Sequence, residues 1–228
     1  MFFMLVALVP AVLVPACATT KGVPKAQLDS CQTAHNKCKT DLDAANARVR
    51  ELEGLRSGEQ NELSLARKRL EAYRSIADKF RKVFSGGDLT IILRNGRLVV
   101  QLPNSILYDL GKAELKPEGI ETVAKVAEVL KSFPERSFLI AGHTDNTPVR
   151  KYTAKYKTNW ELSVLRALGV VVRLQELGVS PGQLAAVGHG EFMPTSENDN
   201  DEGRSQNRRT EIIIMPTLDE IPKLPEKP

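Results

Sequence analysis

Apolar residues recur every seven positions along residues 25–84, a stretch with few turn-forming residues. Before residue 54, the two seam positions hold Leu28, His35, Leu42 and Val49, and Cys31, Cys38, Ala45 and Leu52. The pattern is interrupted near Gly54 and Gly58 and resumes with Leu63, Ala66, Leu70, Tyr73, Ala77, Phe80 and Phe84. This repeat predicts a coiled-coil stalk that forms a parallel homodimer through residues 25–84. The alternative is a single amphipathic helix that packs on the protein's own domain.

Cys31 and Cys38 lie one heptad apart at the same seam position. In a parallel dimer each thiol would meet its twin, so both are candidates for an interchain disulfide in an oxidising compartment. A bond within one chain is disfavoured, because two helical turns separate the Cα atoms by about 10 Å. The alternative is two buried thiols. A metal site of Cys31, His35 and Cys38 would lack a fourth ligand.

Segments of strand and helix character alternate after Ser85-Gly86-Gly87, which breaks the helical pattern. The strand-like runs are 89–93, 97–102, 138–142, 184–188 and 208–214, with a hairpin signal at Asn95-Gly96. A helix is expected from Pro117, with an apolar face of Ile120, Val123, Ala127 and Leu130. The alternation predicts a two-layer α/β sandwich over residues 86–216.

The segments between and after these runs give weaker indications of secondary structure. Thr158 and Glu161 are spaced as the capping box of a helix that runs to about Leu177. Ser180-Pro181 predicts a short helix, and residues 103–116 predict a loop with a short strand. The Pro-rich residues 217–228 predict a disordered tail.

Residues 1–16 are almost wholly apolar. They are shorter than the roughly 20 residues of a membrane span and fit a signal peptide. Val14-Pro15-Ala16-Cys17 resembles a lipobox, although Pro15 is unusual there and the positive start of a signal peptide is missing. The resemblance implies lipidation of Cys17, a linker over residues 17–24 and, from Ala18, the outer membrane. The alternatives are a plain secretory signal and an uncleaved anchor.

Composition narrows the classes of partner. The formal net charge is +4 and the hydrophobic content is 42%, which is ordinary for a globular protein. No block of Lys and Arg with interleaved aromatic residues occurs, so nucleic acid is not an expected partner.

The most informative chemistry lies in residues 142–148 and 158–167. A single Asp, Asp145, follows an apolar strand, and a single Arg, Arg166, lies in the next helix. A carboxylate and a guanidinium that face one pocket can bind a zwitterion, because the first takes an ammonium group and the second takes a carboxylate in a forked pair. The alternative is that Asp145 and Arg166 only pair with each other.

These segments resemble the OmpA-like peptidoglycan-binding domain, and Asn159-Trp160-Glu161-Leu162-Ser163 resembles its MotB-type branch. Further segments extend the resemblance over about residues 86–216: 107–109, 111–115, 188–191 with Pro194, Asn198, 203–204 and 207–209. It implies an OmpA-like α/β sandwich preceded by the helical stalk, and noncovalent binding of peptidoglycan.

The resemblance also assigns site residues. Asp145 would hold the ammonium group of a diaminopimelate residue in the stem peptide, and Arg166 would hold its carboxylate. Asn159, with the backbone amides at the start of the same helix, would receive an anionic group. Arg208 would line the same pocket, and at Gly111 any contact would come from the backbone. No cofactor is implied.

An enzyme is not expected. Residues 86–216 contain no Cys, no His-Glu-x-x-His motif and no nucleophile elbow with a Ser-His-Asp order. A metal site of His143, Asp145 and His189 is disfavoured, because the two histidines are expected to pack at the sheet end. Arg204 and Arg209 are expected to tie the last loop to the sheet. The sequence therefore predicts a lipoprotein of the Gram-negative outer membrane whose domain binds the wall in the periplasm. Its rivals are a MotB-like motor component and an envelope scaffold with an unused pocket.

Overall fold

The computed structural model describes residues 22, 24–84 and 89–221. The predicted signal peptide (1–16), the lipidation site Cys17 and most of the 17–24 linker lie outside these residues, as do residues 222–228 of the predicted tail. The chain divides into two compact units, residues 1–58 and 59–228, and each is described by itself.

The first unit is helical wherever it is described, apart from two residues at its start. Helix α1 runs from Lys25 to Val83, so the prediction of a long helix is confirmed. Its residues up to Gly58 are all exposed, including the seam residues Leu28, Leu42, Val49 and Leu52. Cys31 and Cys38 are exposed free thiols. Pairing of this helix with a second copy stays a prediction, and its exposed apolar seam is compatible with it.

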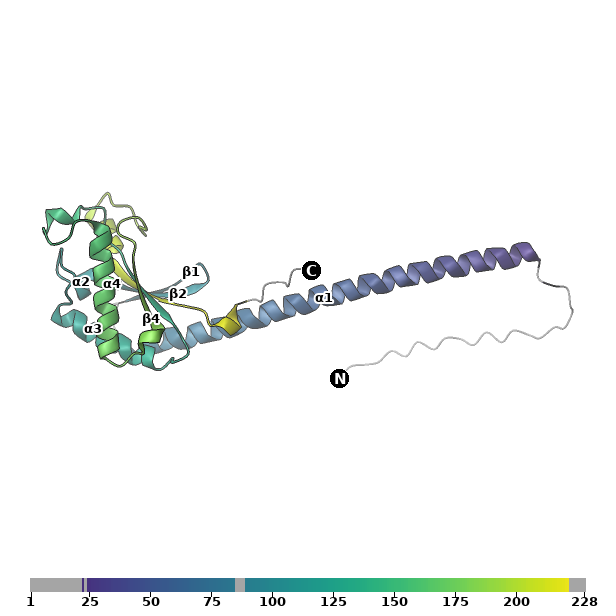
Figure 1. The fold of residues 1–228 in the computed structure, drawn as a ribbon, viewed down its shortest axis with the longest axis horizontal. Helices are drawn as coiled ribbons and strands as arrows, with labels where there is room; N and C mark the ends of the chain where they lie inside the picture. The colour runs from purple at the N-terminus through teal and green to yellow at the C-terminus, as the bar shows by residue number, and fades with distance from the viewer. Residues whose placement is uncertain (1–21, 23, 85–88, 222–228) are drawn as a thin grey trace. The chain divides into compact units, whose positions relative to one another are not determined.

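The second unit contains a five-stranded sheet (Figure 1). The strands are β1 (Thr90–Arg94), β2 (Arg97–Pro103), β3 (Phe138–Gly142), β4 (Leu184–Gly188) and β5 (Arg209–Ile214). Their order is β1-β2-β5-β3-β4, and only β3 and β4 pair in parallel. Asn95 and Gly96 both have positive φ, 51° and 71°, as a type I′ hairpin turn requires. The predicted hairpin is therefore confirmed.

Helices α3 (Pro117–Lys131) and α4 (Asn159–Glu176) cover one face of the sheet and pack against each other (Figure 1). Thr158 caps α4, because its side chain accepts a hydrogen bond from the backbone N–H of Glu161. Apolar side chains of both helices meet those of the sheet, among them Val126, Leu130, Val170, Leu174, Ile140 and Ile212. The predicted two-layer α/β sandwich is thus confirmed.

The core of this unit also includes the end of α1. Tyr73, Ile76, Phe80 and Phe84 are buried in the same cluster as the sheet and α3. The predicted division between a stalk at 25–84 and a domain at 86–216 therefore differs from the structure. Residues 73–84 carry the predicted seam, but they pack on the protein's own domain.

The C-terminal boundary of the domain also differs from the predicted one at residue 216. A short helix, η3 (Leu218–Glu220), lies within the predicted disordered tail. Glu220 is buried and forms an ion pair with buried Arg136, and Gln183 donates hydrogen bonds to the backbone oxygens of Phe133 and Arg136. A buried, paired carboxylate keeps this part of the chain on the domain.

Shorter elements complete the unit: α2 (Asn104–Leu107), η1 (Val149–Lys151), η2 (Pro181–Gln183) and α5 (Asp201–Asn207). Helix α2 occupies part of the predicted 103–116 loop, and the predicted short strand is a single bridge between Tyr108 and Leu115. Ile120 is exposed rather than buried, because Gly119 is the α3 residue that lies against Leu107 of α2.

Candidate functional site

Three separate segments bring charged side chains to one small hollow. Asp145 follows β3, Arg166 lies about two turns into α4, and Arg208 joins α5 to β5. The hollow has a volume of about 20 Å³ and is also lined by Leu110, Gly111, Thr144, Thr147, Val149, Tyr152, Asn159 and Leu162. All four residues predicted to bind the ligand, Asp145, Asn159, Arg166 and Arg208, therefore line one cavity.

Asp145 is only 5% exposed and is held in one orientation. Its Oδ2 lies 2.6 Å from Nη1 of Arg208, and its Oδ1 accepts a hydrogen bond of 2.9 Å from the backbone N–H of Thr147. The sequence alternative of an ion pair between Asp145 and Arg166 differs from this arrangement, because Arg208 is the cation that pairs with Asp145. The approach of Arg208 depends on where the α5–β5 junction folds, which no local sequence signal specifies.

Arg166 is only 3% exposed, and its charge is incompletely paired. Its Nε donates to the backbone oxygen of Lys112 at 2.8 Å, and its guanidinium carbon lies 5.0 Å from the ring centre of Tyr108. Among the described residues, no side chain or carbonyl accepts a hydrogen bond from its two terminal nitrogens. Burial lowers the pKa of the Arg166 guanidinium. An anion that reached the terminal nitrogens would relieve this cost.

A second hollow adjoins the first. It has a volume of about 280 Å³ and is lined by Asn104, Ser105, Tyr108, Asp109, Leu110, Lys116, Arg166 and Arg208. The two hollows share Leu110, Arg166 and Arg208. A ligand that reached Asp145 could therefore extend past both guanidinium groups into a wider, partly basic space.

The side chain of Asn159 holds together the loops that surround the site. Its Nδ2 lies 3.3 Å from the backbone oxygen of Asp145, 3.0 Å from that of Thr147 and 2.6 Å from Oε2 of Glu191. An amide nitrogen carries two hydrogens, so these three acceptors use its donor capacity. The side chain expected to receive an anion is thus engaged in joining the loop after β3 to the start of α4.

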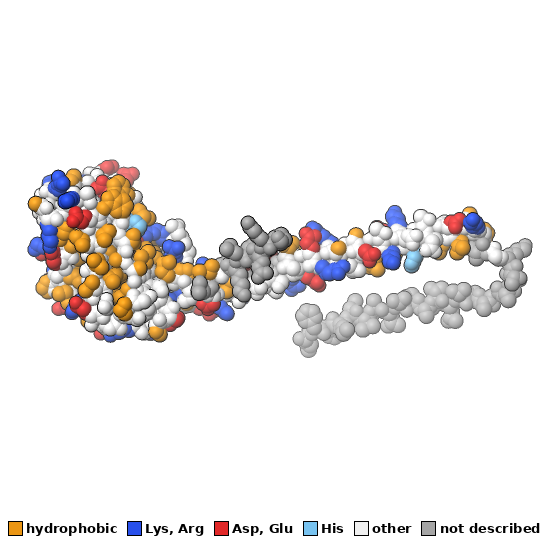
Figure 2. All heavy atoms as spheres, viewed as in Figure 1, with side chains coloured by type: hydrophobic (Ala, Val, Ile, Leu, Met, Phe, Trp, Pro, Cys, Tyr) orange, Lys and Arg blue, Asp and Glu red, His pale blue; other side chains and the backbone are white. Residues whose placement is uncertain are grey.

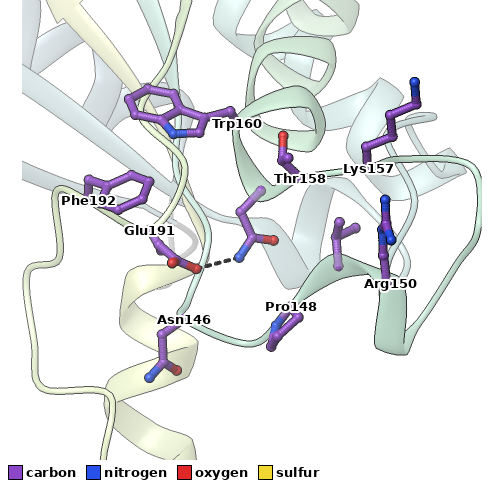
Figure 3. A pocket seen from close by; sticks show the side chains of 10 residues that line it. Asn146, Pro148, Arg150, Lys157, Thr158, Trp160, Glu191 and Phe192 are labelled. Atoms are coloured by element: carbon purple, nitrogen blue, oxygen red, sulfur yellow. Dashed lines mark hydrogen bonds between the residues drawn. The ribbon is translucent and has the colours of Figure 1, made fainter.

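A third hollow lies beyond Asn159 (Figure 3). It has a volume of about 300 Å³, with Trp160 and Phe192 on one side and Arg150 and Lys157 on the other. The rings of Trp160 and Phe192 are stacked, with centroids 5.1 Å apart. Sequence reasoning used Trp160 only as part of a family motif and gave no signal for Phe192, which follows β4 in a loop.

The lack of a side chain at Gly111 leaves room for the segment that follows Asp145. Its φ is +71°, and a Cβ atom there would lie 2.6 Å from Cβ of Tyr152. A side chain at position 111 would therefore displace Tyr152, which follows η1. The residues between Asp145 and Asn159 thus close the hollow against a backbone that carries no side chain.

A separate charged cluster lies at the open face of the sheet. Glu211 is fully buried and binds Arg94, Arg209 and Gln101. Burial acts to raise the pKa of Glu211, but the neighbouring His143, Arg94 and Arg209 outweigh it and hold the pKa well below its usual range. This carboxylate is thus charged and saturated with partners.

The histidines and arginines near this cluster have packing roles. His143 stacks on His189 with ring centroids 4.9 Å apart, and burial lowers the pKa of both side chains. Arg209 donates to the backbone oxygens of Asn207 and Met193, and Arg204 donates to that of Asn198. The predicted tie to the sheet is therefore confirmed for Arg209, which lies in β5, whereas Arg204 joins the loop to α5.

Within residues 22, 24–84 and 89–221, no group of three or more His, Cys, Asp or Glu side chains is arranged to hold a metal ion. In the same part of the chain, no helix combines the length and the apolar character needed to cross a membrane.

The part of the chain that holds this site is similar to known proteins. Residues 107–208 match the model of the OmpA family. The chain is 35% identical to Motility protein B of Bacillus subtilis over 122 residues, which are 52% of this chain and 45% of that protein. It is 32% identical to the Probable lipoprotein YiaD of Escherichia coli over 138 residues, 60% of each chain. The chain thus spans about half the length of these relatives.

Two solved structures share the fold. One is a putative MotB like protein from Desulfovibrio vulgaris, with 27% identity, a TM-score of 0.62 and coverage of 67% of this chain and 94% of that one. The other is the cell wall anchor of the T6SS from Pseudomonas aeruginosa, with 28% identity, a TM-score of 0.53 and coverage of 62% and 94%. Residues 107–208, which hold Asp145, Asn159, Arg166 and Arg208, are an OmpA family domain.

Proposed function

We propose that this protein binds peptidoglycan without covalent chemistry. The diaminopimelate residue of the stem peptide would occupy the two adjoining hollows that share Arg166 and Arg208, with its charged end towards Asp145. The free end of that residue carries an ammonium group and a carboxylate on one carbon. A buried carboxylate and a buried guanidinium in one hollow match both groups.

The proposal rests on the incomplete hydrogen bonding of the buried Arg166 guanidinium. The guanidinium is 3% exposed, and its terminal nitrogens have no protein acceptor among the described residues. These nitrogens are not fully closed off from solvent, so a ligand can reach them. A ligand carboxylate would complete its hydrogen bonds in a forked pair. This arrangement supports Arg166 as the residue that binds the ligand carboxylate.

The other predicted residues support the two charged groups. Asp145 has used one acceptor position on each oxygen, and a carboxylate has about four, so it can still accept from an ammonium group. Arg208 holds the orientation of Asp145 and lines both adjoining hollows. Asn159 fixes the loop that carries Asp145.

We further propose that the protein anchors the outer membrane to the wall through a lipid on Cys17. The lipobox-like sequence before Cys17, the YiaD relative named a lipoprotein and the structural neighbour named a cell wall anchor support this assignment. One noncovalent site is weak, but many copies, or a dimer joined through residues 25–58, would add avidity.

Pelleting of the full chain with diaminopimelate-type sacculi tests the binding claim. Arg166→Gln should lower the affinity by about 2–5 kcal/mol, because it removes one partner of a buried charge-assisted contact. Arg173→Gln is the matched control, since Arg173 lies on the same helix, does not line the three hollows described above and pairs with Glu176. Equal pelleting of both variants and wild type, with all three folded, would place the binding site elsewhere.

A MotB-type motor component is the second candidate. The 35% identity to Motility protein B and the Asn159-Trp160-Glu161-Leu162-Ser163 segment favour it. The two candidates differ at the N-terminus: a motor component needs a membrane helix with an acidic residue, whereas a lipoprotein is cleaved before Cys17. Mass spectrometry of the protein from its host distinguishes a mature chain that begins with a lipidated Cys17 from one that retains residues 1–16.

A further inference from the structure

Exposed aromatic side chains gather at the hollows of the domain. Among the described residues, the exposed Phe, Tyr and Trp side chains are Tyr152, Trp160 and Phe192. Tyr152 lines the first hollow, around Asp145, and Trp160 and Phe192 line the third. Figure 2 shows hydrophobic side chains at the surface where Figure 1 places α4, whose first turn carries Trp160. Large apolar side chains exposed beside a concave surface are typical of a binding site.

The third hollow has two chemically different sides (Figure 3). The rings of Trp160 and Phe192 are stacked with an interplanar angle of 22°, so each ring fixes the other and the pair forms an apolar wall. On the other side lie Arg150 and Lys157, both exposed, whose N–H groups can donate hydrogen bonds to oxygen atoms. A ligand that fits this hollow therefore combines a flat apolar face with an edge rich in oxygen.

The third hollow is continuous with the site proposed above. It shares Val149 and Asn159 with the first hollow, and these two residues are 3% and 8% exposed and form a firm partition. It shares no lining residue with the second hollow. Its volume of about 300 Å³ is at the lower limit for ligand pockets, which is suited to a single ring. The third hollow is therefore placed for a different part of the same polymer than the diaminopimelate residue.

We propose that the third hollow binds an N-acetylated amino-sugar ring of the glycan strand, an inference that rests on the proposed binding of peptidoglycan. The C–H groups on one face of a pyranose ring are slightly positive and pack on the negative face of an aromatic ring such as that of Trp160. The hydroxyl and acetamide oxygens at the edge of the sugar would accept hydrogen bonds from Arg150 and Lys157. A flexible amino-acid chain such as diaminopimelate has no rigid apolar face for the aromatic wall.

A sugar in the third hollow would add to the binding of the stem peptide. The glycan strand and the stem peptide are joined covalently in the wall, so contact of one with its hollow raises the effective concentration of the other. The buried partition of Val149 and Asn159 keeps the two hollows at a fixed separation. The domain would therefore bind the intact wall more tightly than it binds a free stem peptide.

Tryptophan fluorescence tests the proposal in the full chain, because Trp160 is the one tryptophan of the sequence. Titration with tri-N-acetylchitotriose, an uncharged amino-sugar chain without a stem peptide, should change the Trp160 emission in a saturable way at millimolar concentrations. Phe192→Ala removes one ring of the aromatic wall and should weaken this binding about tenfold. Met193→Ala is the matched control and should bind as the wild type does, because Met193 is the next residue, is also exposed and lines none of the three hollows.

A second measurement makes the test independent of the fluorescence change. Saturation-transfer NMR on the sugar detects binding directly, and circular dichroism checks that Phe192→Ala leaves the fold intact. Arg166→Gln should lose pelleting with sacculi but keep the response to the sugar, which separates this inference from the proposed function. A wild-type chain that gives neither signal, or equal affinities of wild type and Phe192→Ala, would overturn the sugar site. Pelleting that still depends on Arg166 would in that case leave the proposed function intact.

Discussion

The buried charges around Glu211 and around Arg166 belong to the same residue types but differ in how completely they are paired. Glu211 at the open sheet face has Arg94, Arg209 and Gln101 as partners and is fully buried. Arg166 is almost as deeply buried, but its terminal nitrogens lack a partner among the described residues. A buried charge with all its partners in the protein stabilises the fold, whereas a guanidinium with free donors can still bind a ligand.

The largest loss of stability is expected from replacing Glu211, whose carboxylate is fully paired. Glu211→Ala leaves Arg94 and buried Arg209 without their common partner. The free energy of unfolding should fall by about 3–5 kcal/mol, as for other broken buried pairs. Denaturant unfolding of the full chain measures it, with Glu121→Ala on the outer face of α3 as control. A loss of less than about 1 kcal/mol would mean that this cluster does not stabilise the fold.

Arg166→Met is expected to change binding rather than stability, in contrast to Glu211→Ala. It removes an incompletely paired buried cation and keeps the side-chain volume, so the free energy of unfolding should stay within about 1 kcal/mol of wild type or rise. Binding to sacculi should nevertheless be lost. Parallel unfolding and pelleting of one preparation checks both. A large loss of stability would show that Arg166 is structural, like Glu211.

A smaller loss of stability is expected at acidic pH. Burial lowers the folded-state pKa of His143 and His189 below 6.5, so the unfolded chain binds more protons as the pH falls through that value, and stability decreases towards pH 5. Glu211 also has a lowered folded-state pKa, so its contribution is present above its unfolded value of 4.5 and is lost below it. Unfolding at several pH values tests this, and His143→Gln should flatten the slope between pH 7 and 5. A rise in stability from pH 7 to 5 would contradict these assignments.

The sequence located Asp145 and Arg166 in one site because each lies at a predictable place on a regular element. A residue after a buried strand and a residue early in the following helix meet at the same end of a sandwich. Arg208 was predicted to line the pocket, but its pairing with Asp145 depends on the path of the chain around α5, which the sequence did not reveal as a helix. The engagement of Asn159 with Glu191 likewise joins loops that are distant in sequence.

The end of α1 shows a limit of periodicity. Tyr73, Ala77, Phe80 and Phe84 fit the seven-residue repeat as well as the earlier residues do, yet they contact the domain core. A heptad pattern states that one helix face is apolar and does not state what covers it.

Competition by a free amino acid tests the central claim most directly. Diaminopimelate should release the full chain from diaminopimelate-type sacculi, whereas Nα-acetyl-lysine amide, which has an ammonium group but no carboxylate, should release it far less. Arg166→Gln should remove the difference between the two competitors, and Arg173→Gln should keep it. Equal release of the wild-type protein by diaminopimelate and Nα-acetyl-lysine amide would contradict the assignment of Arg166 as the receptor of the ligand carboxylate.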